Sequence, residues 1–299
     1  MIIFGGRNNF VILLVICLLI NIFSCNSRMN KKILEDNIFS LMKEFDGDVS
    51  IYIKHKTQNL EIGFNENKKM PTASLIKIPI MIKIFDKIKK GELSLDSTVV
   101  YYQDSIGYKW KGEDALSSFK DGETITIKKL LTHMITFSDN HASLWLQKLA
   151  GGGETINNWL SENNFKNTRV NSRTKGREKD KEKFGWGQTT AKEMVNLITM
   201  IRESKVVSKS YSDKMYRHLT RIYWDEEALS QIPANFQVAS KQGAINRSRS
   251  EVVLVNAPKG DYAFCIITDN QTDTSWNFDN EGFVLIRKLS KLLWDYFGS

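Results

Sequence analysis

Ser74 and Lys77 are a pair of residues whose types and spacing could do chemistry together. They lie in the stretch PTASLIKIPIM, which turns apolar directly after the serine. Residues three apart on a helix share a face, so the amine of Lys77 could take the proton of the Ser74 hydroxyl if burial lowered the lysine pKa. The same spacing occurs at three other places in the chain. The alternative to a catalytic pair is therefore a serine at the N-terminus of a helix and a lysine on its solvent-exposed face.

Two further motifs decide between these alternatives. The tripeptide SDN stands at residues 138–140, 64 residues after Ser74, and KQG begins 103 residues later at Lys241. This order resembles the three-motif signature of class A β-lactamases and penicillin-binding proteins, the penicillin-recognising serine hydrolases. The resemblance covers the chain from its first helix to its last, through the segments TASLIKIPI, MITFSDNHASLWL, GGG, TTAKEMVNLI and SKQGA.

The resemblance implies catalytic roles for the matching residues. Ser74 would attack the carbonyl, Lys77 would help to activate it, and Ser138 would pass a proton to the leaving amine. Lys241 would attract the substrate carboxylate and tune Ser138. The backbone NH groups of Ser74 and Ala244 would form the oxyanion hole, so that the whole is an acyl-transfer site.

Substrate binding is assigned to a second set of residues. Asn140 would hold the substrate amide, and Gln242 stands where the third motif normally has a threonine or serine, which changes that end of the pocket. Arg247 and Arg249 could bind the carboxylate through two hydrogen bonds each, although an exposed turn is the alternative for at least one of them. The candidate substrate-binding residues are Asn140, Gln242, Gly243, Ala244, Arg247 and Arg249.

The omega loop, residues 169–190, departs from the family pattern. Class A β-lactamases carry a glutamate there that activates the deacylating water, and counting forward from TRV puts Thr174 at its place. Glu178, Asp180 and Glu182 follow, and Glu178 is our candidate for the missing base, with a solvated charge run as the alternative. Without a base the acyl-enzyme should form and then hydrolyse slowly.

The elements that must position these residues are strands near both ends of the chain and helices between them. Alternating apolar residues predict a strand over 49–54, and three more strand-like runs come near the end. Helical spacing predicts helices over 33–45, 74–90, 125–134, 140–150, 154–162, 191–203 and 282–297, with a capping box of Thr190 and Glu193 before the sixth. We expect an α+β fold of the β-lactamase/transpeptidase type: an antiparallel sheet from both chain ends, flanking helices and an inserted helical subdomain.

The N-terminus has the composition of an export signal. Arg7 precedes the apolar run FVILLVICLLINI, which is short for a membrane span, and the run meets IFSC. This resembles a bacterial lipoprotein signal, with a plain secretory signal or an anchor helix as alternatives. We expect a signal peptide over 1–24, a lipid on Cys25, a tether over 25–32 and a catalytic domain over 33–299, placed in the periplasm or cell envelope.

Composition limits the partners. The formal charge of +8 would favour anionic partners, but the lysines are spread along the chain and an exported protein rarely meets nucleic acid. Only Cys265 would remain for a disulfide in the mature domain, and four scattered histidines give no metal-ligand spacing, so we expect no cofactor and no metal. We also expect a monomer, attached to the membrane by its lipid.

These observations predict an active-site serine hydrolase that forms an acyl-enzyme with β-lactam rings, conferring antibiotic resistance where it turns them over. A peptidase acting on D-alanyl-D-alanine ends of cell-wall peptides, or another ester or amide hydrolase, is the alternative of the same geometry. A pseudoenzyme that only binds cell-wall fragments is the alternative of a different class.

Overall fold

The computed structural model describes residues 30–102, 107–108 and 119–298, and the chain divides into two compact units after Glu44. In the first unit, residues 30–43 are helical, so the predicted helix begins three residues earlier and takes in the end of the predicted tether. The predicted signal peptide and Cys25 lie outside the described residues. No helix among the described residues is long and apolar enough to cross a membrane.

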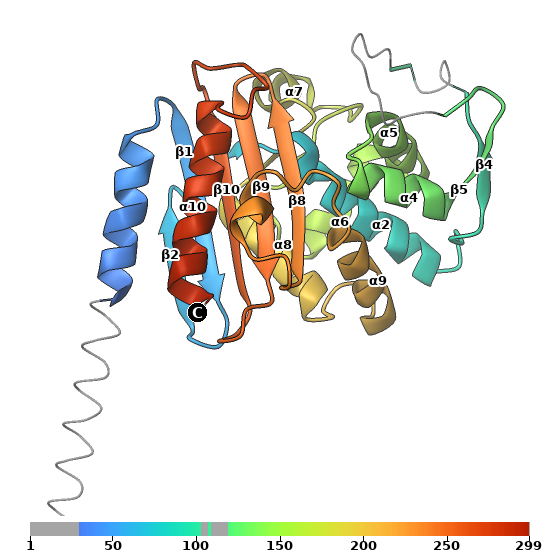
Figure 1. Cartoon of the computed structure of the whole chain (residues 1–299). Helices are drawn as coiled ribbons and strands as arrows, with labels where there is room; N and C mark the ends of the chain where they lie inside the picture. Colours follow the sequence, from blue (N-terminus) through green and yellow to red (C-terminus); the bar gives the residue numbers. More distant parts are fainter. Residues whose placement is uncertain (1–29, 103–106, 109–118, 299) are drawn as a thin grey trace, which may run out of the picture. The chain divides into compact units, whose positions relative to one another are not determined.

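The second unit is built on a five-stranded antiparallel sheet whose strands come from both ends of the chain, as predicted (Figure 1). Val49, Ile51 and Ile53 alternate along the first of these strands, and β1 pairs with β10 from Asp48 opposite Asp269 to His55 opposite Tyr262. In spatial order the strands are β2 (Leu60–Phe64), β1 (Asp48–His55), β10 (Tyr262–Asp269), β9 (Ser248–Val255) and β8 (Val238–Ile245).

Both faces of this sheet are covered. The final helix α10 (Glu281–Phe297) packs on one face, and α8 (Ala191–Arg202) packs on the other, across β1, β9 and β10 (Figure 1). Every residue of β9 is buried for this reason. Side chains of β9 therefore alternate between an α10 face and an α8 face.

The helical part of the unit shares one apolar core with the α8 face of the sheet. Its main helices are α2 (Lys77–Lys89), α4 (Ile127–Thr136), α5 (Asn140–Leu149), α6 (Gly152–Glu162) and α9 (Lys209–Leu219). The last of these was not predicted, because its sequence KSYSDKMYRHL is mostly polar and buries only Ser212, Met215 and Leu219.

Short elements complete the unit. A three-stranded sheet of β3 (Met70–Pro71), β7 (Gly187–Thr189) and β6 (Arg169–Val170) holds the ends of the omega loop, and β4 (Thr98–Val100) pairs with β5 (Thr124–Thr126). The charge run inside the loop forms α7 (Glu178–Phe184), where the sequence analysis expected only loop. The 3-10 turns η1 (Ala73–Ile76) and η2 (Ala228–Gln231) lie against β8 and α10 respectively.

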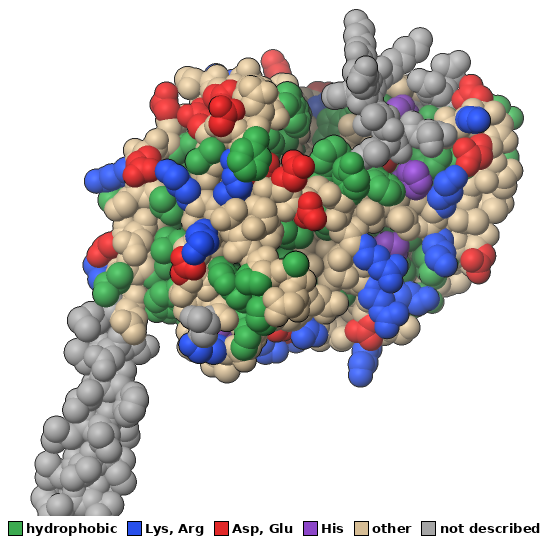
Figure 2. All heavy atoms as spheres, in the orientation of Figure 1, with side chains coloured by type: hydrophobic (Ala, Val, Ile, Leu, Met, Phe, Trp, Pro, Cys, Tyr) green, Lys and Arg blue, Asp and Glu red, His purple; other side chains and the backbone are tan. Residues whose placement is uncertain are grey.

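Positive side chains gather over α9 (Figure 2). Burial lowers the pKa of His218 to about 4, and the charges of Arg221, Lys128 and Lys214 lower it further. A group of positive side chains therefore lies over this helix on the face of the molecule that Figure 2 shows.

Candidate active site

Ser74 lies in the 3-10 turn that leads into α2, and the predicted helix over 74–90 is thus divided in two. Its neighbour Ala73 has a φ of 43°, in the left-handed region that a non-glycine residue rarely adopts. Pro79 occupies the third position of α2, where a missing NH costs no intrahelical bond. The turn delivers the hydroxyl of Ser74 to the amine of Lys77, which donates to it at 3.0 Å.

The SDN motif forms the turn between α4 and α5. Ser138 has a φ of 59°, and the backbone NH of Asp139 donates back to the carbonyl of His133. The carboxylate of Asp139 caps α5 by accepting from the NH of Ala142 at 2.6 Å. This cap holds Ser138 and Asn140 on either side of it, so the middle residue of the motif fixes the two that face the site.

Two buried lysines converge on the hydroxyl of Ser138. Lys77 Nζ donates to Ser138 Oγ at 3.0 Å, and Lys241 Nζ donates to the same oxygen at 3.1 Å. Both lysine side chains are fully buried. Burial, and next the charge of Lys77, hold the pKa of Lys241 well below its usual range.

Gly243 allows β8 to approach the nucleophile. A Cβ at this position would lie 2.9 Å from the backbone N of Ser74, 2.9 Å from the carbonyl O of Thr72 and 2.7 Å from Ser250 Oγ. The hydroxyl of Ser250 in turn donates to the carbonyl of Gly243 at 3.1 Å. The backbone at Ala244 is thereby placed next to that of Ser74, the arrangement an oxyanion hole requires.

Asn140 is held by two partners in the site. Its Oδ1 accepts from Lys77 Nζ at 2.9 Å, and its Nδ2 donates to the hydroxyl of Tyr108 at 3.2 Å. Tyr108 meets the ring of Trp186, from the omega loop, edge-on at 5.5 Å. The sequence analysis missed Tyr108, because no motif marks a tyrosine that acts only by its position.

The prediction that Arg249 binds the substrate carboxylate is wrong. Arg249 is fully buried on the α10 face of β9, between the rings of Trp276 and Phe283, and its guanidinium donates to the carbonyls of Asn246, Ser248 and Ser275. The site lies on the opposite face of the sheet, where Ser250 points.

The structure also gives Arg247 and Gln242 other surroundings than predicted. The exposed Arg247 donates to the carbonyls of Asn270 and Gln271 and so ties the β8–β9 hairpin to the turn after β10. Half-buried Gln242 pairs with Glu251 across the ladder, so its side chain lies on the α10 face while Lys241 lies on the other. Its carbonyl accepts from Lys241 Nζ at 2.9 Å.

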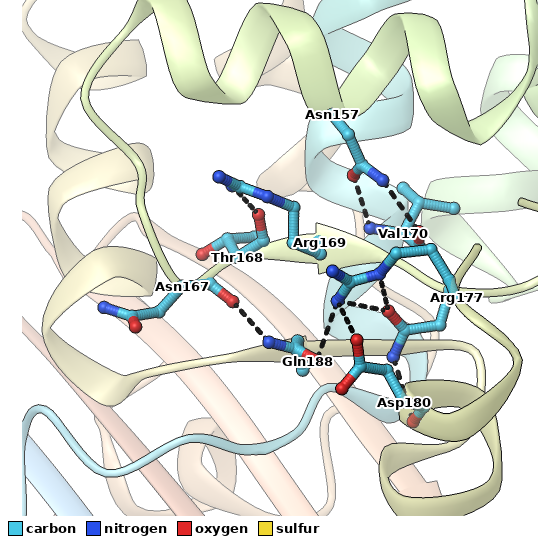
Figure 3. A network of polar contacts seen from close by, with 9 residues as sticks. Asn157, Asn167, Thr168, Arg169, Val170, Arg177, Asp180 and Gln188 are labelled. Carbon is cyan, nitrogen blue, oxygen red and sulfur yellow. Dashed lines mark hydrogen bonds and ion pairs between the residues drawn. The ribbon is translucent and has the colours of Figure 1, made fainter. Parts of the chain in front are cut away.

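The omega loop is held by a polar network centred on Arg177 (Figure 3). The guanidinium of Arg177 donates twice to Asn171 Oδ1, at 3.0 and 2.9 Å, and once to Gln188 Oε1, and it forms an ion pair with Asp180. Asn157 of α6 adds a pair of hydrogen bonds to the backbone of Val170. The loop is therefore an ordered part of the unit.

The sequence analysis placed Thr174 where the family carries its deacylating glutamate. This side chain is buried, donates to the carbonyl of Ser172 and faces Gly153, where an added Cβ would come within 1.8 Å of its hydroxyl. Glu178, our candidate for the base, is exposed and accepts from the backbone NH of Gly176. None of the three carboxylates of the loop is buried.

The capping box predicted at α8 is half formed. Thr190 Oγ1 accepts from the NH of Glu193, as predicted. The carboxylate of Glu193 instead accepts from the backbone NH groups of Lys166, Asn167 and Thr168, just before the omega loop. Glu193 thus fixes the start of the loop.

The geometry supplies the parts of an acyl transfer. Ser74 Oγ, Lys77 Nζ, Ser138 Oγ and Lys241 Nζ form one chain of contacts of 3.0 to 3.1 Å. Along this chain of contacts a proton can pass from the hydroxyl of Ser74 to the amine of Lys77, and from that amine to the hydroxyl of Ser138. The predicted convergence of these four residues is present.

Comparison with known proteins identifies the family. The profile of the β-lactamase enzyme family matches residues 32–297. The β-lactamase VEB-1 of Pseudomonas aeruginosa is 22% identical over 297 residues, which cover 96% of this chain and 97% of the relative. A β-lactamase of Bacteroides uniformis is 24% identical over 278 residues, which cover 88% of this chain and 90% of the relative.

Solved structures share the fold. A class A β-lactamase from Bacteroides cellulosilyticus has a TM-score of 0.77 at 21% identity and covers 89% of this chain and 98% of its own. A mutant of PBP-A, solved as an acyl-enzyme complex with penicillin G, has a TM-score of 0.76 at 19% identity and covers 88% of this chain and 96% of its own. With the three motifs assembled in one site and the family profile spanning most of its length, the chain belongs to the β-lactamase enzyme family.

Proposed function

We propose that this protein is a serine hydrolase that is acylated by β-lactams on Ser74 and hydrolyses the resulting ester slowly. The observation that carries the proposal is the shared contact of Lys77 with the hydroxyls of Ser74 and Ser138, at 3.0 Å each. A neutral Lys77 accepts the proton of Ser74 as its oxygen attacks the lactam carbonyl. Ser138 then gives its own proton to the ring nitrogen as the C–N bond breaks, and regains one from Lys77.

The remaining groups of the site stabilise charge. The backbone NH groups of Ser74 and Ala244 meet the oxyanion of the tetrahedral intermediate, because Gly243 lets β8 approach the turn η1 that carries Ser74. A charged Lys241 attracts the substrate carboxylate and keeps Ser138 oriented through its 3.1 Å contact.

Slow deacylation follows from the omega loop. Hydrolysis of the ester needs a base beside a water, and the buried hydroxyl of Thr174 is already engaged with the carbonyl of Ser172. The PBP-A mutant that shares this fold was solved as an acyl-enzyme complex with penicillin G, which supports the acylation step of the proposal.

A fluorescent penicillin tests the nucleophile. Wild type should give a covalent adduct of one acyl group by intact-mass spectrometry, and Ser74→Ala should give none. Ser40→Ala is the matched control: it also has a lysine three residues later, but its hydroxyl donates to the carbonyl of Asp36 within the N-terminal helix. Equal labelling of wild type and Ser74→Ala would refute the assignment.

Turnover assays separate the related activities. Nitrocefin hydrolysis that continues after a burst of one equivalent supports a slow β-lactamase. Release of D-alanine from D-alanyl-D-alanine peptides at a higher rate would make the protein a peptidase, and the absence of any adduct would leave a cell-wall-binding pseudoenzyme.

We further propose that the protein is exported and held at the cell envelope by a lipid on Cys25. The motif IFSC after the apolar run supports this location. Cys25→Ser should release the protein from the membrane fraction and stop incorporation of labelled palmitate. Unchanged fractionation of the variant would contradict the anchor.

A further inference from the structure

The two lysines of the site pose a problem of charge. Lys77 must be neutral to act as a base, whereas Lys241 must be charged to attract a carboxylate. Their amines share one hydroxyl oxygen at 3.0 and 3.1 Å, and both are fully buried, so protonating both is costly. The chemistry therefore requires that the two amines share one extra proton and that this proton resides on Lys241.

The hydrogen-bond acceptors nearest to the two amines favour the proton on Lys77 instead. Among the described residues, Lys77 Nζ donates to at least four oxygens: Ser74 Oγ, Ser138 Oγ, the Ser138 carbonyl and Asn140 Oδ1. Lys241 Nζ donates to Ser138 Oγ and to the carbonyl of Gln242. Since acceptors stabilise an ammonium, these contacts favour a charged Lys77 and a neutral Lys241.

A buried carboxyl lies on the other face of the sheet, behind Lys241. The ladder pairs Lys241 with Val252 and Gln242 with Glu251, so Glu251 is one step along from Lys241 and points to the α10 face. Its side chain is 1% exposed. It accepts from the hydroxyl of Ser240, at 2.6 Å, and from the backbone NH of Ala228, at 3.0 Å.

The other charged groups around Glu251 are already engaged. Glu227, before η2, forms a 2.6 Å ion pair with Arg287 of α10, and both are buried. Arg249, on the same strand and face, gives its guanidinium to backbone carbonyls and lies between two aromatic rings. Cys265 of β10 lies on the α8 face and is neutral, since burial and then the charge of Glu251 raise its pKa well above its usual range.

We propose that Glu251 is a positioning residue that places the shared proton on Lys241 and so leaves Lys77 neutral and able to act as the base. The proposal rests on the acylation chemistry proposed above. Glu251 touches neither substrate nor reacting atoms, and acts through the attraction between its negative charge and the ammonium of Lys241 across the low-dielectric sheet.

The electrostatics agree in direction with this geometry. The charge of Glu251 raises the pKa of Lys241, opposing the effects of burial and of Lys77. Burial raises the pKa of Glu251 itself to about 7, while the bonds from Ser240 and Ala228 lower it. The influence of Glu251 on Lys241 is therefore present above neutral pH and fades as Glu251 takes up a proton.

Lysine titration by NMR tests the proposal without any substrate. In protein labelled with ¹³C at lysine Cε, with Lys77 and Lys241 assigned from Lys77→Arg and Lys241→Arg, Lys241 should titrate at higher pH than Lys77. The amide of Glu251→Gln can accept from the NH of Ala228 through its oxygen and donate to the hydroxyl of Ser240 through its NH2. In this variant the pH at which Lys241 titrates should fall by about one pH unit. A Lys77 that titrates above Lys241 in wild type would overturn the proposal, whatever the activity.

Acylation kinetics supply the second readout. With a fluorescent penicillin, the alkaline limb of the pH profile should move to lower pH by about one pH unit in Glu251→Gln. At pH 5.5, where wild-type Glu251 is itself protonated, the two proteins should acylate at similar rates. Ser240→Ala is the matched control, because it removes a hydrogen bond of Glu251 and keeps the carboxyl group. Loss of this bond raises the pKa of Glu251, but the carboxylate is charged at the alkaline end of the profile, so the alkaline limb should stay in place.

The outcomes separate this proposal from a purely structural role. If Glu251 only supported the packing of β8, each variant would acylate more slowly by the same factor at every pH, and the alkaline limb of neither pH profile would move. That result would overturn the proposal. Should Glu251→Gln not fold, the order of the two lysine titrations in wild type still decides. Absence of acylation in wild type would count against the proposed function alone.

Discussion

Replacing Gly243 by alanine should move one oxyanion donor, the backbone NH of Ala244, away from Ser74 without removing any catalytic side chain. The new Cβ would lie 2.9 Å from the backbone N of Ser74 and 2.9 Å from the carbonyl O of Thr72, whereas ordinary contact begins at 3.4 Å. Neither of these is a flexible side-chain end, so β8 and η1 must move apart by about 0.5 Å.

The expected loss follows from the role of these donors. Misplacing one oxyanion donor lowers the rate by about 10²-fold to 10³-fold, and we expect Gly243→Ala to acylate about 10²-fold more slowly, a loss of about 2.7 kcal/mol of transition-state stabilisation. The assay is the second-order rate of adduct formation with a fluorescent penicillin. Binding of the intact β-lactam should change much less.

Gly63→Ala is the matched control for this prediction. It adds the same methyl group to β2, at the opposite edge of the same sheet, where the nearest atoms belong to the side chain of Glu66. Its acylation rate should equal that of wild type. A Gly243→Ala protein that acylates within twofold of wild type, at an unchanged melting temperature, would refute the placement of the oxyanion hole.

Three further predictions concern stability. Arg177→Ala removes both donors to the buried Oδ1 of Asn171 and should lower the free energy of unfolding by about 1–3 kcal/mol in urea titrations; no change would mean that the omega loop does not depend on this network. Arg287→Met leaves Glu227 buried without its ion-pair partner and should cost about 3–5 kcal/mol, part of which the added change Glu227→Gln should restore; a double variant no better than the single one would contradict the pairing. The folded-state pKa of Glu251, about 7, lies above the value of 4.5 for an unperturbed glutamate. The contribution of protonated Glu251 to the free energy of unfolding is therefore fully present below pH 4.5 and is lost as the pH rises to about 7. Between these pH values wild type should lose about 3 kcal/mol of unfolding free energy relative to Glu251→Gln, and parallel pH–stability curves would show that Glu251 is not buried as described.

The sheet was predictable because its strands alternate visibly. Val49, Ile51 and Ile53 face one way along β1, and the three C-terminal runs are rich in β-branched residues, so both ends of the chain read as strand. Apolar periodicity does not distinguish a 3-10 turn from the first turn of an α-helix, and the division at Ile76 and Lys77 was missed for that reason.

Other misses have physical causes of their own. The helices α7 and α9 are mostly polar, so no apolar stripe marks them. Arg249 stands in the short stretch before VVLV, where sequence cannot tell a turn from a strand, and the structure extends β9 back to Ser248. The strand that carries Arg249 also carries Glu251, directly before its apolar residues. A glutamate in a strand that is buried on both faces needs hydrogen-bond partners, and the motif analysis did not use this signal.

The catalytic motifs were predictable as a set and their surroundings were not. Ser74, Lys77, Ser138 and Lys241 meet because order and spacing along the chain encode the family. Tyr108, Ser250 and Glu251 act through partners that are distant in sequence, in contacts such as that of Tyr108 with Asn140, and only the folded chain brings them together.

The position of β8 at the end of the strand order has a consequence for what the protein can recognise. With β9 on one side, the main chain of β8 has its other hydrogen-bonding edge free of a strand partner in the sheet of the described residues, and β8 lies against the turn η1 that carries the serine. An extended peptide-like ligand can lie along that edge as a sixth strand and be held by amides that every amino acid possesses. Such binding depends on the direction and length of the ligand's backbone and tolerates different side groups. β-Lactams with very different substituents would then bind through the same few main-chain hydrogen bonds.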